Sequence, residues 1–261
     1  MTANGSVGTI EVLSERDFAP TVADEIVASI LEVLEEKSFC SLCLSGGTSP
    51  AAVYRLLGLP PRAQEVPWDK VQIFWGDERW VPGDDPKSNY RLACETFLNQ
   101  LRGKTPKIEA VPTSLSDPDI GAEEYSKRIR EIGYYGSGLE SPPFDVVLLG
   151  VGADGHFASV FPGDPVPDDR LCYSTGVKSD GTSRITIHPQ ALLAAGRVLF
   201  VVKGGEKSQV LERFFVESAM AQEHTESQLL EFPILRARQS KNTLYWFLDT
   251  EAAQLIPDYL R

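Results

Sequence analysis

Short, continuously apolar runs alternate with amphipathic segments along the chain, and this alternation restricts the possible folds more than any other feature. The runs "FCSLCL", "VQIFW", "FDVVLL" and "RVLFVV" offer little polar surface on either side. Strands of this kind are typical of parallel sheets, which helices cover on both faces. Residues 20–37, between two such runs, carry Val22, Ile26 and Ile30 at helical spacing. The sequence therefore predicts an α/β fold with a mostly parallel central sheet.

The same periodicities predict where the elements lie. Strands are expected at residues 9–14, 39–44, 71–75, 144–150, 184–188, 197–203 and 244–249, and helices at 20–37, 51–57, 88–101, 121–133, 189–196 and 206–218. Pro50 suits a first helical position behind Thr48 or Ser49 as N-cap, and Ser88 or Asn89 is expected to cap another helix. Residues 134–143 and 163–170 are expected to be surface loops. Because composition is even along the chain, residues 1–261 are expected to form one domain.

The balance of charge limits the partners. The formal net charge is −12, whereas nucleic acids and anionic membranes both attract a basic surface. We therefore expect neither as a partner. A small anionic substrate remains compatible with this charge, because a local group of cations and backbone N–H groups outweighs acidic side chains that lie beyond a screening length of about 8–10 Å.

Cysteine usage and the N-terminal residues favour a cytoplasmic protein. The start of the chain, "MTANGSVGTIEVLSERD", has no basic segment followed by an apolar one, so we expect no signal peptide. Cys40 and Cys43 form a C-x-x-C inside a predicted strand, where two buried small residues are the simplest interpretation. A zinc ribbon needs a second pair, and Cys94 and Cys172 do not form one.

Four unusual segments follow four predicted strands: "SGGTSP", "GDERW", "GVGADGH" and "KGGEK". Ligands in open parallel sheets bind beyond the carboxyl ends of the strands, so these segments are expected at one rim. "SGGTSP" is typical of a phosphate site, because glycines let the backbone approach and a helix start presents N–H groups. The candidate phosphate-binding residues are Gly46, Gly47, Thr48, Lys203, Lys207 and Arg184. Tight turns and a surface salt bridge of Arg184 are the structural alternatives.

Gly150, Gly152 and Gly155 match the G-x-G-x-x-G pattern of dinucleotide-binding turns. That pattern requires a long helix directly afterwards. Pro162-Gly163 arrives only seven residues after Gly155, and a proline inside a helix costs roughly 3 kcal/mol. We therefore interpret the glycines as a loop that holds His156.

His156 is the strongest single candidate for chemistry, since histidine titrates near neutral pH and can activate water. Asp154 could orient its ring or balance its charge. His188 and His224 are expected to be structural or solvated. The wide scatter of the three histidines gives no metal-ligand spacing, and a G-x-S-x-G elbow is lacking. No cofactor or metal is expected.

"GDERW" places Asp77, Glu78 and Arg79 at the end of an apolar strand. Consecutive charges there are costly unless they are paired or used. A structural ion-pair cluster is the alternative to a catalytic role. Together these residues predict an enzyme that acts on a phosphorylated small molecule, with a histidine handling a proton.

The segments "LSGGTSPAAVYRLL", "GDERWVP", "SNYR" and "DGHFASVFPG", in this order, resemble the 6-phosphogluconolactonases, and the resemblance spans almost the whole chain. It implies a three-layer α/β/α sandwich related to Rossmann folds, similar to the aminosugar-phosphate isomerase-deaminases. It also implies hydrolysis of 6-phospho-D-glucono-1,5-lactone, the second step of the oxidative pentose phosphate pathway. The chain departs from the family at Phe157, where threonine is usual, and at His188.

The resemblance assigns roles to particular residues. His156 matches the base that activates water, and Arg79 an arginine of the active site. Arg184 and Lys207 match phosphate-binding positions, with Gly46, Gly47 and Thr48 completing the cradle, while the family varies at Lys203. Asp77 and Asp154 occupy acidic positions that the deaminases share.

Two other functions remain open at this point. An aminosugar-phosphate deaminase is one, although Phe161 stands where deaminases carry a catalytic glutamate. A non-catalytic sugar-phosphate sensor is the other, and it is disfavoured because His156, Asp154 and Arg79 are all present. We expect a monomer or a weak homodimer.

Overall fold

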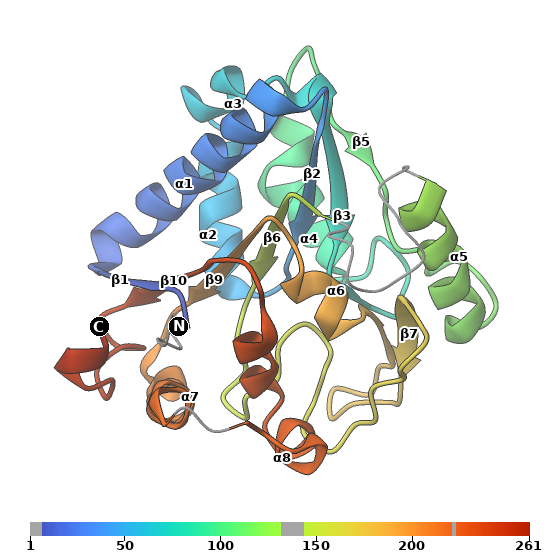
Figure 1. The fold of residues 1–261 in the computed structure, drawn as a ribbon. Coiled ribbons are helices and arrows are strands. Elements are labelled where there is room, and N and C mark those ends of the chain that lie inside the picture. Colours follow the sequence, from blue (N-terminus) through green and yellow to red (C-terminus); the bar gives the residue numbers. More distant parts are fainter. Residues whose placement is uncertain (1–6, 132–143, 221–222) are drawn as a thin grey trace.

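The structure, a computed structural model, describes residues 7–131, 144–220 and 223–261. Its centre is a seven-stranded sheet in the order β1-β10-β9-β6-β2-β3-β5, and every neighbouring pair is parallel (Figure 1). The strands are β1 (Thr9–Leu13), β2 (Cys40–Leu44), β3 (Val71–Trp75), β5 (Lys107–Ile108), β6 (Val146–Leu149), β9 (Arg197–Val202) and β10 (Leu244–Asp249). The predicted α/β fold, a mostly parallel sheet flanked by helices, is confirmed.

Helices on both sides explain why the central strands are apolar throughout. β2 and β6 are buried at every position, Cys40 and Cys43 included. α1 (Glu15–Glu36) and α2 (Thr48–Leu57) pack together on one side, while α7 (Ser208–Ala219) lies across β10 from α1 (Figure 1). Phe214 of α7 packs on Trp246 of β10, with ring centroids 4.9 Å apart. The C-x-x-C is therefore part of the core, as predicted.

Two predicted helix starts are wrong. α1 begins before Pro20, because the Ser14 side chain accepts a hydrogen bond from the backbone N–H of Asp17 and caps the helix there. α2 begins at Thr48 with Gly47 as its N-cap, and neither Thr48 nor Ser49 caps it. The predicted cap of α4 (Asn89–Thr96) by Ser88 is confirmed, since its hydroxyl accepts from the N–H of Arg91. That helix is shorter than predicted.

A second sheet of three antiparallel strands lies beside the first. Its order is β4 (Asp77–Arg79), β8 (Arg184–Ile187) and β7 (Cys172–Thr175). β8 is a strand, as predicted, but it belongs to the small antiparallel sheet and not to the parallel one. β4 continues the chain directly after β3, so this sheet carries "DER" to the rim of the central sheet.

The remaining elements are α5 and a number of short helices. They are α3 (Arg62–Glu65), α5 (Pro118–Glu131), α6 (Pro189–Leu193), α8 (Glu226–Glu231) and the 3-10 helices η1 (Trp68–Lys70), η2 (Leu98–Gln100), η3 (Gly205–Lys207), η4 (Pro233–Gln239) and η5 (Asp258–Leu260). Residues 163–170 contain no helix or strand, as predicted. The expected loop at 134–143 lies outside the described residues.

Candidate active site

A cavity of about 220 Å³ lies at the carboxyl ends of β9, β6, β2 and β3, which are neighbours in the sheet. The chain passes from β2 to β3 on one side and reaches β6 on the other, so the cavity sits at a topological switch point. The expectation that the four unusual segments meet at one rim is confirmed. Eight of the predicted site residues line the cavity: Gly46, Gly47, Thr48, Asp77, Arg79, His156, Lys203 and Lys207.

The turn between β2 and α2 is shaped for an anion. Gly47 has φ +100°, a conformation that favours glycine, and it starts α2 without a side-chain cap. The first N–H groups of this ten-residue helix therefore keep their hydrogen-bonding capacity at the cavity. A side chain at position 46 would collide with Asn89, since a Cβ there would lie 1.9 Å from Asn89 Oδ1.

Two lysines add positive charge, but they are held differently. Lys203 Nζ lies 2.7 Å from Glu15 Oε1 and 5.3 Å from the ring centroid of Phe18, so α1 engages this ammonium group. Lys207 Nζ is 3.8 Å from Glu206 Oε1, a longer and weaker ion pair. Lys207 is thus the lysine better placed to contact an anion in the cavity.

His156 forms a pair with Asp154. Its Nδ1 lies 2.6 Å from Asp154 Oδ1, and its backbone N–H donates to the same oxygen. The hydrogen bond from His156 lowers the pKa of Asp154 to about 2, so this carboxylate is ionised at neutral pH. An ionised acceptor at Nδ1 assigns the ring hydrogen to that nitrogen, which leaves the Nε2 lone pair to accept a proton.

The glycines of the loop make room for this pair. A Cβ at position 152 would lie 2.1 Å from His156 Nδ1, and one at position 155 would lie 2.4 Å from the Phe232 ring. Gly155 also has φ +88°. No helix follows Gly155 before Asp164. The glycine pattern therefore serves the histidine and not a dinucleotide.

Phe161 forms one wall for the imidazole. The two rings stack with centroids 4.3 Å apart at an interplanar angle of 27°. Lys178 Nζ lies 4.8 Å from the centroid of Phe161 and forms an ion pair with Asp164. The sequence indicated only that Phe161 replaces an acid, and its packing against His156 required the structure.

Glu78 organises the backbone around Arg79. This buried carboxylate accepts hydrogen bonds from the N–H groups of Arg79, Asn89 and Tyr90 at 2.7–2.8 Å and from the Ser88 hydroxyl at 3.1 Å. Burial raises the pKa of Glu78, and the three N–H donors oppose that shift. Sequence reasoning missed this role, although Ser88 at a helix start was a signal for it.

Arg79 and Asp77 are both fixed before any substrate arrives. Arg79 Nη1 donates to the Lys87 carbonyl at 2.5 Å, while its buried Nε has no hydrogen-bond partner among the described residues. Ser159 Oγ donates to Asp77 Oδ2 at 2.6 Å, and Asn89 Nδ2 donates to the Asp77 carbonyl. Asp77 thus braces the histidine loop against β4.

Asp154 and Arg184 are the two predicted residues that do not line the cavity; Asp154 pairs with the lining residue His156, whereas Arg184 has other partners. Its Nη2 lies 2.6 Å from Asp180 Oδ2, its Nη1 donates to Thr182, and its side chain is 7% exposed. In this position it stabilises the turn before β8. His188 is buried, and its Nδ1 accepts from the Gln190 N–H at the start of α6, in line with the structural role expected for it.

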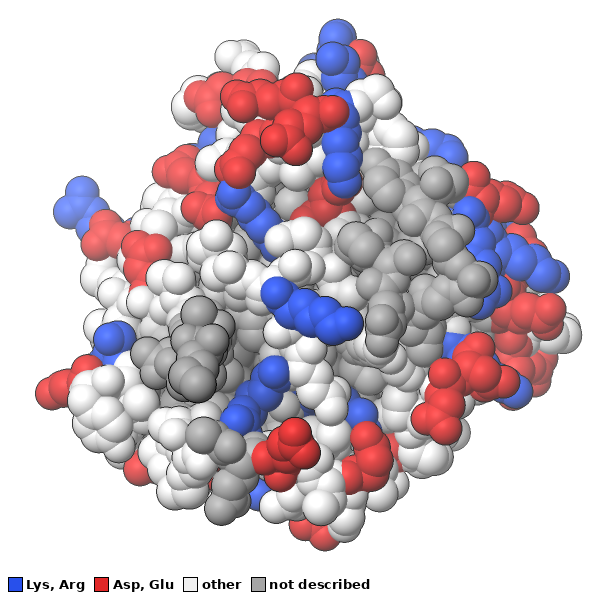
Figure 2. Space-filling model, viewed as in Figure 1, with Lys and Arg blue, Asp and Glu red and all other residues white. Residues whose placement is uncertain are grey.

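Metal-ligand clusters, membrane-spanning helices and a basic surface were each sought among the described residues. None of their acidic, histidine and cysteine side chains gather in threes as a metal ion would require. Helices long and apolar enough to cross a membrane are absent from residues 7–131, 144–220 and 223–261. On the face in Figure 2, acidic and basic described side chains are interspersed and form no broad basic surface.

Comparison with known proteins gives the family. The model of the family described as glucosamine-6-phosphate isomerases/6-phosphogluconolactonase matches residues 13–246. A protein of Nostoc sp. named 6-phosphogluconolactonase is 34% identical over 94% of this chain and 96% of its own. A Synechocystis sp. protein of the same name is 33% identical over 88% and 90% of the two chains.

Solved structures agree with these relatives. The crystal structure of 6-phosphogluconolactonase from Thermotoga maritima superposes with a TM-score of 0.76 at 28% identity, over 92% of this chain and 99% of that one. A monomeric glucosamine-6-phosphate deaminase shares the fold at a TM-score of 0.76 and 18% identity, over 95% and 99% of the two chains. The chain belongs to the glucosamine-6-phosphate isomerase/6-phosphogluconolactonase family.

Proposed function

We propose that this protein hydrolyses 6-phospho-D-glucono-1,5-lactone to 6-phospho-D-gluconate. The observation that carries the proposal is that His156, held by Asp154, shares one cavity with the uncapped start of α2 and with Lys207. A proton acceptor and an anion site in one cavity suit a phosphorylated ester. The relatives named 6-phosphogluconolactonase support the same substrate.

The proposed chemistry needs one water molecule and one base. His156 Nε2 takes a proton from the water as its oxygen attacks the lactone carbonyl carbon. Arg79, whose guanidinium the Lys87 carbonyl anchors, stabilises the negative charge that develops on the carbonyl oxygen. When the tetrahedral intermediate collapses, the bond from carbon to the ring oxygen breaks, and Nε2–H protonates that oxygen. Asp154 keeps the ring oriented and balances its transient positive charge.

The phosphate is assigned to the start of α2 and to Lys207. The N–H groups of Gly47 and Thr48 at the start of α2 and the ammonium of Lys207 are the proposed contacts. The test of the proposed function is a coupled assay on freshly generated lactone, corrected for spontaneous hydrolysis. Acceleration over the spontaneous rate is expected, and its absence would refute the proposal.

Lys207→Ala is expected to raise KM for the phosphorylated lactone by about 10–100-fold, because a hydrogen bond to a charged group contributes roughly 1.5–3 kcal/mol. KM for unphosphorylated glucono-1,5-lactone should change little. Steady-state kinetics on both lactones measure this difference, and equal losses would show that Lys207 does not contact the phosphate. Arg184→Ala is the matched variant: an equally selective loss there would place Arg184 at the phosphate, despite its pairing with Asp180.

A second prediction separates the lactonase from a deaminase. Phe161 cannot transfer a proton and stacks on His156 where deaminases place a glutamate, so the ring-opening relay of that reaction is interrupted. We expect no ammonia from glucosamine 6-phosphate at enzyme concentrations that hydrolyse the lactone within seconds. Ammonia release that depends on His156 would overturn the assignment and implicate another acid, such as Asp164.

The four cysteines are free thiols, three of them buried. This supports the proposal of a reducing, cytoplasmic location.

A further inference from the structure

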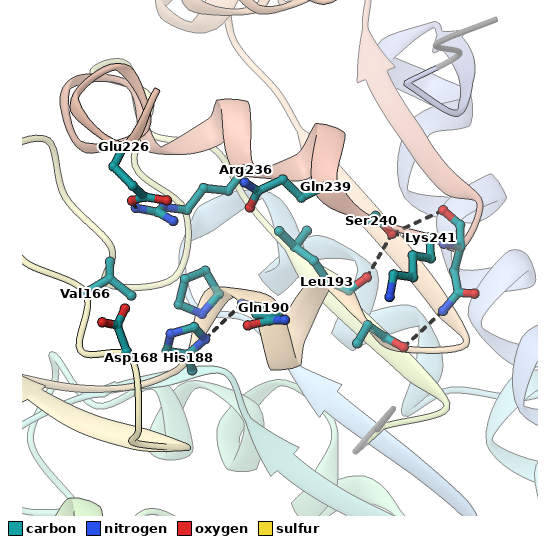
Figure 3. A pocket seen from close by; sticks show the side chains of 13 residues that line it. Val166, Asp168, His188, Gln190, Leu193, Glu226, Arg236, Gln239, Ser240 and Lys241 are labelled. Carbon is teal, nitrogen blue, oxygen red and sulfur yellow. Dashed lines mark hydrogen bonds and ion pairs between the residues drawn. The ribbon is translucent and has the colours of Figure 1, made fainter. Parts of the chain in front are cut away.

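A second, larger cavity of about 560 Å³ lies between α6 and η4 and shares no lining residue with the first. Figure 3 shows His188 and Gln190 on the α6 side and Arg236, Gln239 and Ser240 on the η4 side. The proposed hydrolysis uses none of these residues. Its lining combines apolar side chains with polar ones, and the polar groups differ in how many hydrogen bonds they already make.

Arg236 is the charged group at the centre of the argument. Its side chain is only 10% exposed, and its Nε is buried with no hydrogen-bond partner among the described residues. Its Nη2 lies 3.1 Å from Oε2 of Glu226, a side chain that is 79% exposed. An exposed carboxylate is a weak partner for a buried guanidinium and can turn into solvent at little cost. When Glu226 turns away, the terminal Nη groups of Arg236 are therefore able to donate to a bound anion.

The uncharged groups indicate what the rest of such a ligand offers. The side-chain amides of Gln190 and Gln239 line the cavity and make no hydrogen bond within the described part of the chain. Amides both donate and accept, which suits hydroxyl groups. By contrast, Ser240 Oγ already donates to the Leu193 carbonyl, and the Asn242 amide donates to Ala194 and Ala195.

The charges of the lining favour a ligand with a single negative charge. Arg236 and Lys241 are its cations and Asp168 and Glu226 its acidic groups, so the lining offers no excess of positive charge to a dianion. Burial, and to a smaller extent the positive charge of the neighbouring Arg236, lowers the pKa of His188 to about 4. This ring therefore adds no positive charge at neutral pH. A carboxylate fits these conditions better than a phosphate dianion does.

We propose that this cavity is a second binding site for a small polyhydroxylated monocarboxylate, with its carboxylate on Arg236 and its hydroxyls on Gln190 and Gln239. η4 connects the site to the catalytic loop. The N–H of Ile234, in the first turn of η4, donates to the Gly155 carbonyl at 3.0 Å, directly before His156. A ligand that contacts η4 therefore lies one hydrogen bond away from the base of the histidine loop.

Calorimetric titration of the full chain with D-gluconate tests the site, with sorbitol as the matched probe that lacks the carboxylate. We expect D-gluconate to bind with a Kd near or below about 1 mM, and sorbitol not to bind. Arg236→Met, which keeps an unbranched stem but removes the guanidinium, and Gln239→Leu are each expected to weaken binding, the former at least about 10-fold. Lys207→Ala, in the other cavity, should leave this Kd unchanged.

Each remaining outcome counts against the site. Binding that Lys207→Ala removes but Arg236→Met does not would place the probe in the first cavity. Tighter binding of inorganic phosphate than of D-gluconate at Arg236 would overturn the carboxylate assignment, and an absence of binding would refute the site. Gln239→Leu keeps the test valid if Arg236→Met fails to fold. Because binding is measured without turnover, the result is independent of the proposed lactone hydrolysis.

Discussion

Replacement of His156 with asparagine is expected to lower kcat for the phosphorylated lactone by about 10²–10⁴-fold, the usual contribution of a positioned acid–base group. Asparagine can still donate to Asp154, but it has no nitrogen that takes a proton from water. KM should stay near its original value, because Lys207 and the α2 turn are unchanged. The measurement is the coupled assay, with the spontaneous rate subtracted.

The matched control is His224→Asn, the same exchange at a histidine outside the cavity that contacts Arg238. It should retain full activity. If His156→Asn turns over at a rate close to that of the unaltered protein, another group must be the base. A loss of kcat accompanied by a large rise in KM would instead mean that the loop had collapsed, since Gly152 and Asp154 pack directly against the ring.

Much of the fold could be predicted because a strand that is buried on both faces of a sheet is apolar at nearly every position, and such a run is visible in the sequence. β2 and β6 are apolar at nearly every position since helices cover both sides of the sheet. The location of the site followed from the same runs: polar and glycine-rich segments directly after such strands have to lie at the carboxyl edge. His156, Arg79 and the turn at Gly47 were predicted as candidates in this way, and the structure places all three at one cavity.

The order of the strands and the small antiparallel sheet could not be predicted. β4 and β7 are short and polar. The pairing of β4 with β8 depends on contacts between segments about 100 residues apart, such as Asp77 with Thr186, whereas β7 pairs with β8 across a short connection. No local periodicity records such a pairing. The pairing of Arg184 with Asp180 could not be predicted for a related reason, because Asp180 belongs to a turn whose shape the sequence does not specify.

Glu78 is the clearest example of a site residue whose role only the structure gives. Three consecutive charges indicated either an ion-pair cluster or a catalytic group, yet Glu78 is neither. It accepts from three backbone N–H groups and one hydroxyl, and so joins β4 to the start of α4. Asn89, which it fixes, packs against Gly46 and bonds to the Asp77 carbonyl. The Glu78 carboxylate thereby fixes β4 and, through Asn89, the turn at Gly46 on two sides of the cavity near Arg79.

Glu78→Ala is therefore expected to lower the free energy of unfolding by about 3 kcal/mol or more, because each buried donor that loses its acceptor costs roughly 1–3 kcal/mol. Urea unfolding at neutral pH measures this change. Glu95→Ala is the matched control on the same helix: Glu95 is exposed and pairs only with Arg91 among the described residues, so its loss should cost less than about 0.5 kcal/mol. Equal, small effects of both variants would show that water replaces the carboxylate freely, and that Glu78 does not hold the cavity together. If the larger loss is found, activity at temperatures where Glu78→Ala remains folded should still fall, since Arg79 and Asn89 lose the acceptor that sets their positions.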